Sequence, residues 1–289
     1  MNIDSFENRL HEYMSLMRLD RPVGIYLLLW PTLWALWLAG QGQPPQSVVL
    51  VFILGVIIMR SAGCVINDIA DRDIDRHVTR THNRPLAAGR IHRHEARILF
   101  AVLCLLAFAL VLTQNILTIQ LSFVGLALAI SYPFMKRFHH LPQIHLGVAF
   151  GWSIPMAYAA VTGHVPAHAW LLFMCNALWS VIYDTQYAMV DRQDDLKIGV
   201  KSTAILFGRQ DKRIIAYLQM LLLALLMLVG LLTERGGLYY LGIATAACFA
   251  LYQQFLIRNR EPADCFKAFL NNNSFGMAVF CGLLLDFLP

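Results

Sequence analysis

Acidic and amide side chains are crowded into one short stretch of the chain, "VINDIADRDIDRHV" at residues 65–78. Five of them fall within nine residues, namely Asn67, Asp68, Asp71, Asp73 and Asp75. Asn67, Asp71 and Asp75 are four residues apart, and residues with that spacing share one face of a helix. Asp68 lies near that face, whereas Asp73 points away from it. The stretch therefore predicts a helix with a stripe of oxygen ligands along one side.

A second acidic stretch, "YDTQYAMVDRQDD" at residues 183–195, has the same character. Asp184, Asp191 and Asp195 are spaced seven and four residues apart, so they too share a face of a helix, and Asp194 flanks them. The paired aspartates of the first stretch recur as Asp191 and Asp195, 120 residues later. This repetition indicates an internal duplication. Acidic residues at one helix end could simply face water at the membrane boundary, but two matching copies argue against that explanation.

The chemistry that suits two carboxylate stripes is the binding of a divalent cation. Like charges four residues apart on a helix repel each other by roughly 0.2–0.5 kcal/mol, so a counterion is expected. Oxygen ligands favour Mg²⁺, which one or two carboxylates usually hold together with substrate phosphates. Basic loops follow both stretches, "RTHNRPLAAGRI" from Arg80 and "KIGVKSTAILFGRQ" from Lys197, and their cations can bind the remaining phosphate oxygens. The sequence therefore predicts a clamp for a magnesium-bound diphosphate.

The segments that must position these stripes are strongly apolar. Hydrophobic residues make up 58% of the chain and charged residues only 14%, against about 25% charged residues in an average soluble domain. A membrane span needs roughly 20 mainly apolar residues. Nine segments qualify: 22–40, 47–66, 96–113, 116–132, 144–161, 167–190, 214–232, 238–257 and 269–288. We therefore expect an all-α, polytopic membrane protein with nine transmembrane helices.

The distribution of Lys and Arg predicts the orientation of these helices. Most of the 23 basic residues lie in the N-terminal arm or in connections that follow even-numbered segments, and the opposite face has only Arg235. Short loops rich in Lys and Arg stay in the cytoplasm, which places the N-terminus inside and the C-terminus outside. The net charge of +5 is explained by this topology and by attraction to anionic lipid or substrate, not by nucleic-acid binding.

One helical domain over residues 1–289 is expected, with residues 1–21 as an amphipathic cytoplasmic arm. This arm lacks the charged, apolar and small-residue regions of a cleavable signal peptide. The six cysteines include no CxxC pair and the histidines no HExxH. A disulfide framework or a zinc site is therefore not expected.

The motifs "NDIADRDID" and "YDTQYAMVDRQDD", together with "RPLAAG", "YPFMKR" and "GWSIPMA", resemble those of the UbiA-type membrane prenyltransferases. The similarity covers nearly the whole chain, with no departure at the acidic positions. It implies nine transmembrane helices around a central cavity open to lipid, with Mg²⁺ bound largely through diphosphate. The chain looks most like bacterial inner-membrane members that transfer a polyprenyl group from polyprenyl diphosphate to 4-hydroxybenzoate. In those members the group is attached ortho to the hydroxyl during ubiquinone biosynthesis.

The resemblance also implies roles for individual residues. Five residues are implied to be catalytic: Asp71, Asp75, Asp191, Asp195 and Lys136. The four aspartates and Asn67 are the implied metal ligands. Substrate binding is implied for Arg60, Asn67, Asp68, Arg84, Tyr132, Asp184, Tyr187 and Lys201. Arg60 stands inside an apolar segment, where an ionisable side chain is costly and usually functional, and we expect it to bind the carboxylate of the aromatic acceptor.

The implied reaction releases diphosphate and leaves an allylic cation, which the electron-rich ring attacks. Aromatic side chains of the apolar segments are expected to wall the cavity and stabilise that cation. The candidates are Trp30, Trp34, Trp152, Tyr158, Trp179 and Tyr187.

Two other classes of protein also use membrane carboxylates. A divalent-cation transporter holds its ion near the bilayer midplane, whereas these acids gather at one end of the helices. A membrane phosphotransferase that acts on nucleotide-activated alcohols carries interleaved glycines that "NDIADRDID" lacks. The sequence leaves open a sister prenyltransferase with another acceptor, the natural prenyl chain length, the oligomeric state and the base that removes the ring proton.

Overall fold

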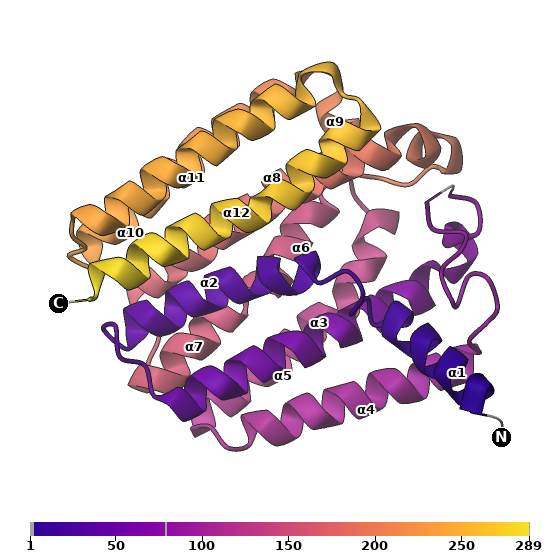
Figure 1. Cartoon of the computed structure of the whole chain (residues 1–289), viewed down its shortest axis with the longest axis horizontal. Helices are drawn as coiled ribbons and strands as arrows, with labels where there is room; N and C mark the ends of the chain where they lie inside the picture. The colour runs from indigo at the N-terminus through magenta and orange to yellow at the C-terminus, as the bar shows by residue number, and fades with distance from the viewer. Residues whose placement is uncertain (1–2, 79, 289) are drawn as a thin grey trace.

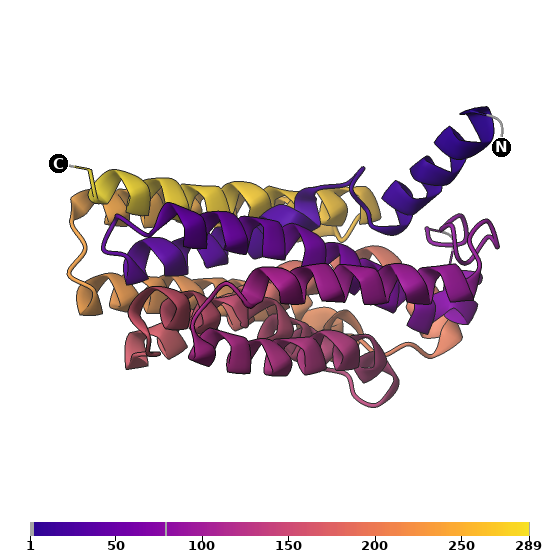
Figure 2. The ribbon, with the colours of Figure 1, turned by 90° about the horizontal axis from the view of Figure 1, so that it is seen from below.

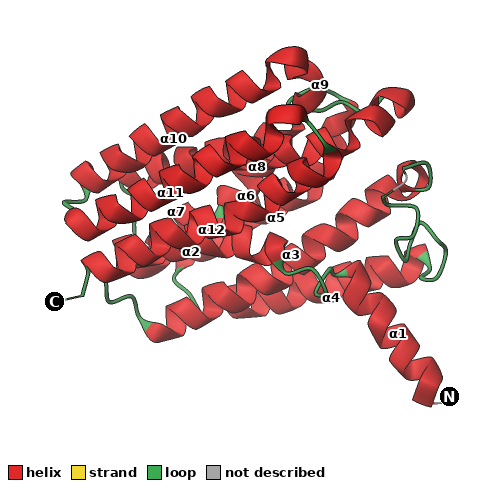
Figure 3. Ribbon diagram, turned by 45° about the horizontal axis from the view of Figure 1, so that its top comes forward, coloured by secondary structure: helices red, strands yellow, loops and turns green. Residues whose placement is uncertain are grey.

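The apolar segments fold as long helices that run side by side along the longest axis of the molecule (Figure 1). The computed structural model describes residues 3–78 and 80–288; Met1 and Asn2 of the predicted arm, Thr79 and Pro289 lie outside the described residues. Every regular element within that part of the chain is a helix, as Figure 3 shows, which confirms the predicted all-α class. The α-helices are α1 (Ile3–Leu16), α2 (Val23–Ala39), α3 (Gln46–Asp75), α4 (Arg93–Val111), α5 (Ile116–Ser131), α6 (Pro142–Gly151), α7 (Ser153–Thr162), α8 (Ala167–Ile198), α9 (Thr203–Phe207), α10 (Asp211–Leu232), α11 (Gly237–Leu256) and α12 (Pro262–Asp286). Short 3₁₀ helices are η1 (Tyr132–Arg137), η2 (Gly208–Gln210) and η3 (Ile257–Asn259).

Seven helical segments of the described chain are long and apolar enough to cross a membrane. They are Gln46–Asp75, Arg93–Val111, Ile116–Arg137, Pro142–Thr162, Thr203–Leu232, Gly237–Asn259 and Pro262–Asp286. The shorter apolar helix α2, with 17 residues, and the 32-residue helix α8 complete the nine predicted segments. Large apolar side chains on outer faces, such as Ile116, Leu231 and Leu251, are exposed, as contact with lipid requires. The chain is a multi-pass membrane protein.

The fifth predicted segment, residues 144–161, is not one continuous helix. It is divided into α6 and α7 at Trp152. Pro155 explains the break, because proline has no amide hydrogen to donate to the carbonyl of Gly151 four residues earlier. Gly151 also packs against Asn176 of α8, where a β-carbon would lie 2.7 Å from the amide nitrogen.

The boundary between the third and fourth predicted segments is fixed by Asn115. Its side chain accepts a hydrogen bond from the amide of Thr118 at 3.0 Å and so caps the start of α5. The same side chain donates to the carbonyl of Ala159 at 2.6 Å, which ties this turn to the end of α7. The two predicted segments are therefore two separate helices.

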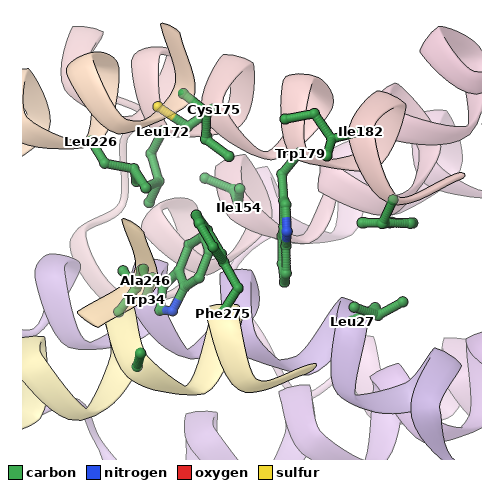
Figure 4. Close-up of a cluster of buried hydrophobic side chains, with 14 of the residues drawn as sticks. Leu27, Trp34, Ile154, Leu172, Cys175, Trp179, Ile182, Leu226, Ala246 and Phe275 are labelled. Atoms are coloured by element: carbon green, nitrogen blue, oxygen red, sulfur yellow. The ribbon is translucent and has the colours of Figure 1, made fainter. Parts of the chain in front are cut away.

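The two acidic stretches adjoin two different hydrophobic clusters of the helix bundle. The larger cluster joins α2, α7, α8 and α10–α12, and Trp34 and Trp179 lie in it with ring centroids 5.4 Å apart (Figure 4). The smaller cluster joins the C-terminal half of α3 to α4, through Val65 and Leu103. The acidic end of α3 thus belongs to the smaller cluster, and the acidic end of α8 extends from the larger one.

Polar side chains inside the larger cluster fix α8 against α12. The indole of Trp179 donates to Asn272 at 2.9 Å, and the amide of Asn272 donates to Gln186 at 2.8 Å. Amides buried in an apolar interior are costly unless they are paired, so these bonds select one register between the two helices.

The polar connections gather at one end of the molecule. Figure 1 shows α1 and α9 at that end, with the C-terminus at the other. Figure 2 shows α1 projecting from the bundle beside the loop that follows α3. Arg9 and Tyr13 of α1 bind Glu95 at the start of α4, at 2.8 and 2.7 Å, and hold the arm there.

Candidate active site

The helices α3 and α8 carry the two acidic stretches past the apolar part of the chain. With 30 and 32 residues, they are about 45 Å long at 1.5 Å per residue, whereas the hydrocarbon core of a bilayer measures about 30 Å. Their last turns therefore extend beyond the hydrocarbon, and both stretches are helical as predicted. Both line one cavity of about 1020 Å³ at the end where the polar connections gather.

The first acidic face is buried and paired with cations from three different segments. Asp68, Asp71 and Asp75 are at most 5% exposed, so their charges need partners. Arg84 lies 3.1 Å from Asp68 and 2.7 Å from Asp75. Arg18 lies 2.6 Å from Asp68, and Lys136 of η1 binds Asp71. Asp73 is exposed and does not line the cavity, so the face predicted for it is confirmed.

The second acidic face is paired with Arg80 from the loop after α3. Its guanidinium donates to both oxygens of Asp191, at 3.0 and 2.5 Å, and lies 4.6 Å from the centroid of the Tyr187 ring. Asp195 lies beyond the apolar part of α8, and burial together with the neighbouring Asp191 carboxylate raises the pKa of Asp195 to about 7. A carboxyl group with that pKa releases its proton readily when a cation binds beside it.

The inner end of the cavity has a different character. Arg60 stands seven residues before Asn67 on α3, which is about 10 Å along the helix. Its Nη1 donates to the thiol of Cys64, its Nε has no hydrogen-bond partner among the described residues, and its guanidinium lies 5.8 Å from the Phe150 ring. Gly24 leaves the necessary space, because a β-carbon there would lie 2.4 Å from the guanidinium.

An apolar groove of about 410 Å³ continues from this inner end between α3, α4, α5 and α7. Arg60, Tyr132 and Phe150 line both the cavity and the groove, so the two spaces meet at these side chains. Gly55 and Gly63 face the groove, and a β-carbon on Gly55 would meet no atom within 4 Å. The site therefore joins an ionic chamber to an apolar channel.

Residues 28–278 match the model of the UbiA prenyltransferase family. The chain belongs to the UbiA prenyltransferase family. It is 60% identical over 286 residues to the 4-hydroxybenzoate octaprenyltransferase of Alkalilimnicola ehrlichii, covering 99% of this chain and 98% of that protein. It is 62% identical over 282 residues to the enzyme of the same name from Nitrosococcus oceani, covering 98% of this chain and 99% of that protein.

Solved structures of the family have the same fold. A UbiA homolog from Aeropyrum pernix K1 is similar with a TM-score of 0.81 and 26% identity, over 92% of this chain and 98% of that one. A UbiA homolog from Archaeoglobus fulgidus, solved with GPP and Mg²⁺, is similar with a TM-score of 0.70 and 20% identity, over 93% and 99%.

All the side chains implied by the UbiA resemblance line the same cavity. They are Arg60, Asn67, Asp68, Asp71, Asp75, Arg84, Tyr132, Lys136, Asp184, Tyr187, Asp191, Asp195 and Lys201. Two further cations belong to the site but were not among the predicted residues, namely Arg18 and Arg80. The sequence places both in basic segments, but only the fold shows that they reach the aspartates.

The predicted aromatic wall is partly wrong. Tyr187 lines the cavity and Trp152 lines the apolar groove. Trp34, Tyr158 and Trp179 instead lie in the larger hydrophobic cluster, and Trp30 packs against it. Their positions inside apolar helices predict burial but not which face points to the cavity. Other aromatic rings line the cavity instead: Tyr26, Tyr132, Phe150, Tyr183, Phe266 and Phe269.

The donor set fits Mg²⁺ shared with a substrate better than a metal held by protein alone. Within the described residues, no three His, Cys, Asp or Glu side chains form a metal-binding group by themselves. The carboxylates instead face the cavity from α3 and α8, and Oδ1 of Asp71 is buried without a hydrogen-bond partner. Mg²⁺ is usually held by one or two carboxylates together with phosphate oxygens and water.

Proposed function

We propose that this protein transfers a polyprenyl group from polyprenyl diphosphate to the ring of 4-hydroxybenzoate, ortho to the hydroxyl, with release of diphosphate. The observation that carries the proposal is the junction of the ionic chamber and the apolar groove at Arg60. A substrate with a diphosphate head and an isoprenoid tail needs both spaces, and an aromatic acid needs a cation where they meet. The names of the relatives, with about 60% identity over nearly the whole chain, support this acceptor and a role in ubiquinone biosynthesis.

The cations of the chamber would bind the diphosphate. In the structure Arg80, Arg84 and Lys136 neutralise aspartates. Each would be available to an anionic ligand if the carboxylates held a metal ion instead. Mg²⁺, when bound by Asn67, Asp71, Asp75, Asp191 and Asp195, would neutralise charge on the leaving diphosphate. A family member from Archaeoglobus fulgidus was solved with GPP and Mg²⁺, which supports a metal cofactor but not the individual ligands.

The chain's own side chains then favour ionisation of the substrate. Guanidinium and ammonium groups that are already oriented stabilise the charge that develops on the departing diphosphate. The faces of aromatic rings near the reacting carbon, from Tyr132, Phe150 and Tyr187, attract the allylic cation. The apolar lining where the groove meets the cavity would limit access of water, which would otherwise capture that cation.

The isoprenoid tail is assigned to the apolar groove. The groove runs along α3 from Gly63 to Val51, which is about 18 Å at 1.5 Å per residue. Three bonds of an extended chain advance roughly 3.5 Å, so an isoprene unit of four bonds spans about 4.6 Å. The groove therefore takes about four units, and the rest of a longer tail would extend into lipid.

We place the protein in the bacterial inner membrane, with the N-terminus in the cytoplasm and the C-terminus on the periplasmic side. The polar end with the cavity would face the cytoplasm, where soluble 4-hydroxybenzoate and Mg²⁺ are available. The basic loops that surround the cavity support this orientation.

The function is tested with the protein in lipid nanodiscs, supplied with Mg²⁺ and prenyl diphosphates of several lengths. Three acceptors are compared: 4-hydroxybenzoate, homogentisate and 1,4-dihydroxy-2-naphthoate. Prenylation of 4-hydroxybenzoate, with one diphosphate released per product, is expected. Prenylation of only one of the other two acceptors would show that the acceptor is wrong, and Mg²⁺ flux without diphosphate release would indicate a transporter.

A further inference from the structure

Asp184 lies deeper in the cavity than the other acidic residues of the site. It precedes Asp191 by seven residues on α8, which is about 10 Å along the helix. Arg60 precedes Asn67 by the same interval on α3. Both side chains line the cavity, so Arg60 on α3 and Asp184 on α8 each lie about 10 Å further along their helix than the acidic clamp.

This depth separates Asp184 from the metal site. Ligands of Mg²⁺ lie about 2.1 Å from the ion. Asp184 and Asp195 are eleven residues apart, or about 16 Å along α8, so they cannot share one ion. Asp68, Asp71, Asp75 and Asp191 all form ion pairs, whereas Asp184 has none with any described residue.

The Asp184 side chain has a polar neighbour on α6. This neighbour is Gln143, which lines the same cavity. Gln143 is 4% exposed, and its oxygen accepts from the amide of Thr203 at 3.1 Å, which leaves its amide hydrogens for the carboxylate. The charged groups that face Asp184 are Arg60, Lys136 and Arg80. The result is a carboxylate that lies beside an amide donor and forms no ion pair with the described residues.

The reaction needs such a group at this place. When the ring attacks the allylic carbon, the ring carbon ortho to the hydroxyl carries both its hydrogen and the new substituent. Aromaticity returns only after a base has taken that hydrogen as a proton. A positioned carboxylate is an effective general base when water is excluded.

We propose that Asp184 is the general base that removes the ring proton, an assignment that rests on the proposed function. The bond from carbon to the diphosphate oxygen breaks, and its electron pair leaves with diphosphate. A π pair of the ring forms the new carbon–carbon bond. The carbon–hydrogen pair then returns to the ring as the proton moves to the Asp184 carboxylate, which passes it to the departing diphosphate or to water at the cavity mouth.

Other side chains of the cavity suit this role less well. The hydroxyl of Tyr132 donates to the carbonyl of Gly63 at 3.2 Å, and the hydroxyl of Tyr183 is paired with Ser180 at 2.9 Å. No histidine is found among the described residues that line the cavity. With its carboxylate on Arg60, an aromatic acid would extend its ring into the cavity that Asp184 also lines.

The test compares Asp184→Asn and Asp184→Glu with the unchanged protein in nanodiscs. The acceptor is 4-hydroxybenzoate, either unlabelled or carrying deuterium at both ring positions ortho to the hydroxyl. We expect Asp184→Asn to lower kcat roughly 10²- to 10⁴-fold, the usual contribution of a general base, and Asp184→Glu to restore part of it. In Asp184→Asn the deuterated acceptor should react clearly more slowly, because proton removal then limits turnover.

Asp191→Asn is the matched control, since it lies on the same helix and also loses one carboxylate. It should slow the loss of diphosphate, which precedes removal of the ring proton. The deuterated and unlabelled acceptors should therefore react at nearly the same rate in this variant. Equal rates for both acceptors in Asp184→Asn would overturn the assignment, and so would a raised Mg²⁺ requirement in that variant, which would make Asp184 a metal ligand.

A variant without measurable turnover is examined by a second measurement. The substrate is prenyl diphosphate with ¹⁸O at the oxygen that bridges carbon and phosphorus, incubated with acceptor and folded Asp184→Asn. The label should still move to the non-bridging oxygens, because the carbon–oxygen bond can break and re-form without removal of the ring proton. Loss of scrambling would refute the role as a base. Failure of the unchanged protein to prenylate 4-hydroxybenzoate would instead refute the proposed function, so the two failures are distinguishable.

Discussion

Arg60 is expected to bind the carboxylate of the aromatic acceptor, and its replacement should weaken the binding of that substrate alone. The side chain has no ion pair with the described residues, and its Nε is buried without a partner. It therefore keeps donors for a carboxylate, which guanidinium binds through two parallel hydrogen bonds. The prenyl diphosphate head would be bound about 10 Å away, at the level of Asn67.

The size of the effect follows from the bonds that are lost. In Arg60→Lys, one of two charge-assisted hydrogen bonds disappears, which costs about 1.5–3 kcal/mol. At 1.4 kcal/mol per tenfold change, the Michaelis constant (KM) for the acceptor should rise roughly 10- to 150-fold. In Arg60→Ala, a buried ion pair is broken at a cost of about 3–5 kcal/mol, which corresponds to roughly 150- to 4000-fold.

The assay is a cycle of enzyme and acceptor variants. Two acceptors, the acid 4-hydroxybenzoate and its uncharged amide 4-hydroxybenzamide, are each titrated with the unchanged protein, Arg60→Lys and Arg60→Ala, and the KM values are compared. The unchanged protein should prefer the acid, and Arg60→Ala should lose that preference, because the pairing energy is the coupling term of the cycle. Gly24→Ala gives an independent perturbation, since its β-carbon would displace the guanidinium without removing it. If the KM for prenyl diphosphate rises instead, or if the preference for the acid survives in Arg60→Ala, the reasoning is refuted.

Four further predictions concern the clamp, its cation, the groove and the topology. Replacement of each clamp aspartate by asparagine should remove most turnover while insertion into the membrane persists, whereas Asp73→Asn should be mild; an equal loss at Asp73 contradicts the face assignment. The four variants are Asp71→Asn, Asp75→Asn, Asp191→Asn and Asp195→Asn. Chelator should abolish activity and Mg²⁺ restore it, with the apparent Mg²⁺ affinity falling as the pH drops below 7. The affinity falls at low pH because burial and the Asp191 carboxylate raise the pKa of Asp195 to about 7, and a protonated Asp195 must lose its proton to bind a cation. An Mg²⁺ affinity that does not change between pH 6 and 8 argues against this role of Asp195. Gly55→Trp should fill the groove about 8 Å from Arg60, so the KM for octaprenyl diphosphate should rise while geranyl diphosphate is accepted as before; parallel changes for both would place the tail elsewhere. A reporter after Pro289 should be periplasmic and one near Arg90 cytoplasmic, and reporters on the same side would exclude an odd number of spans between them.

The membrane fold could be predicted from the sequence because burial in lipid imposes a simple rule on length and composition. Each apolar run of about 20 residues forms one helix, apart from residues 144–161, and the basic loops between them gather at one end. The division at Trp152 could not be predicted from hydropathy, because α6 and α7 are equally apolar. It depends on the missing amide hydrogen of Pro155 and on the contact between Gly151 and α8.

The acidic faces of the site could be predicted because helical spacing is a local property. The spacing of Asn67, Asp71 and Asp75 is enough to place them on one side of α3. The partners of those acids depend on contacts between distant segments, and no local pattern contains them. Arg18 approaches Asp68 across 50 residues, and Arg80 approaches Asp191 across 111. The aromatic wall could not be predicted for the same reason, since Trp34 and Trp179 are buried by packing between α2, α8 and α12.

The position of the new bond in the product tests the central claim most directly. The protein in nanodiscs is incubated with Mg²⁺, geranyl diphosphate and 4-hydroxybenzoate, and the product is analysed by NMR. We predict a carbon–carbon bond at the ring carbon ortho to the hydroxyl, with both oxygen functions free. An ether at the hydroxyl, an ester at the carboxylate, or no product at all from 4-hydroxybenzoate would contradict the account.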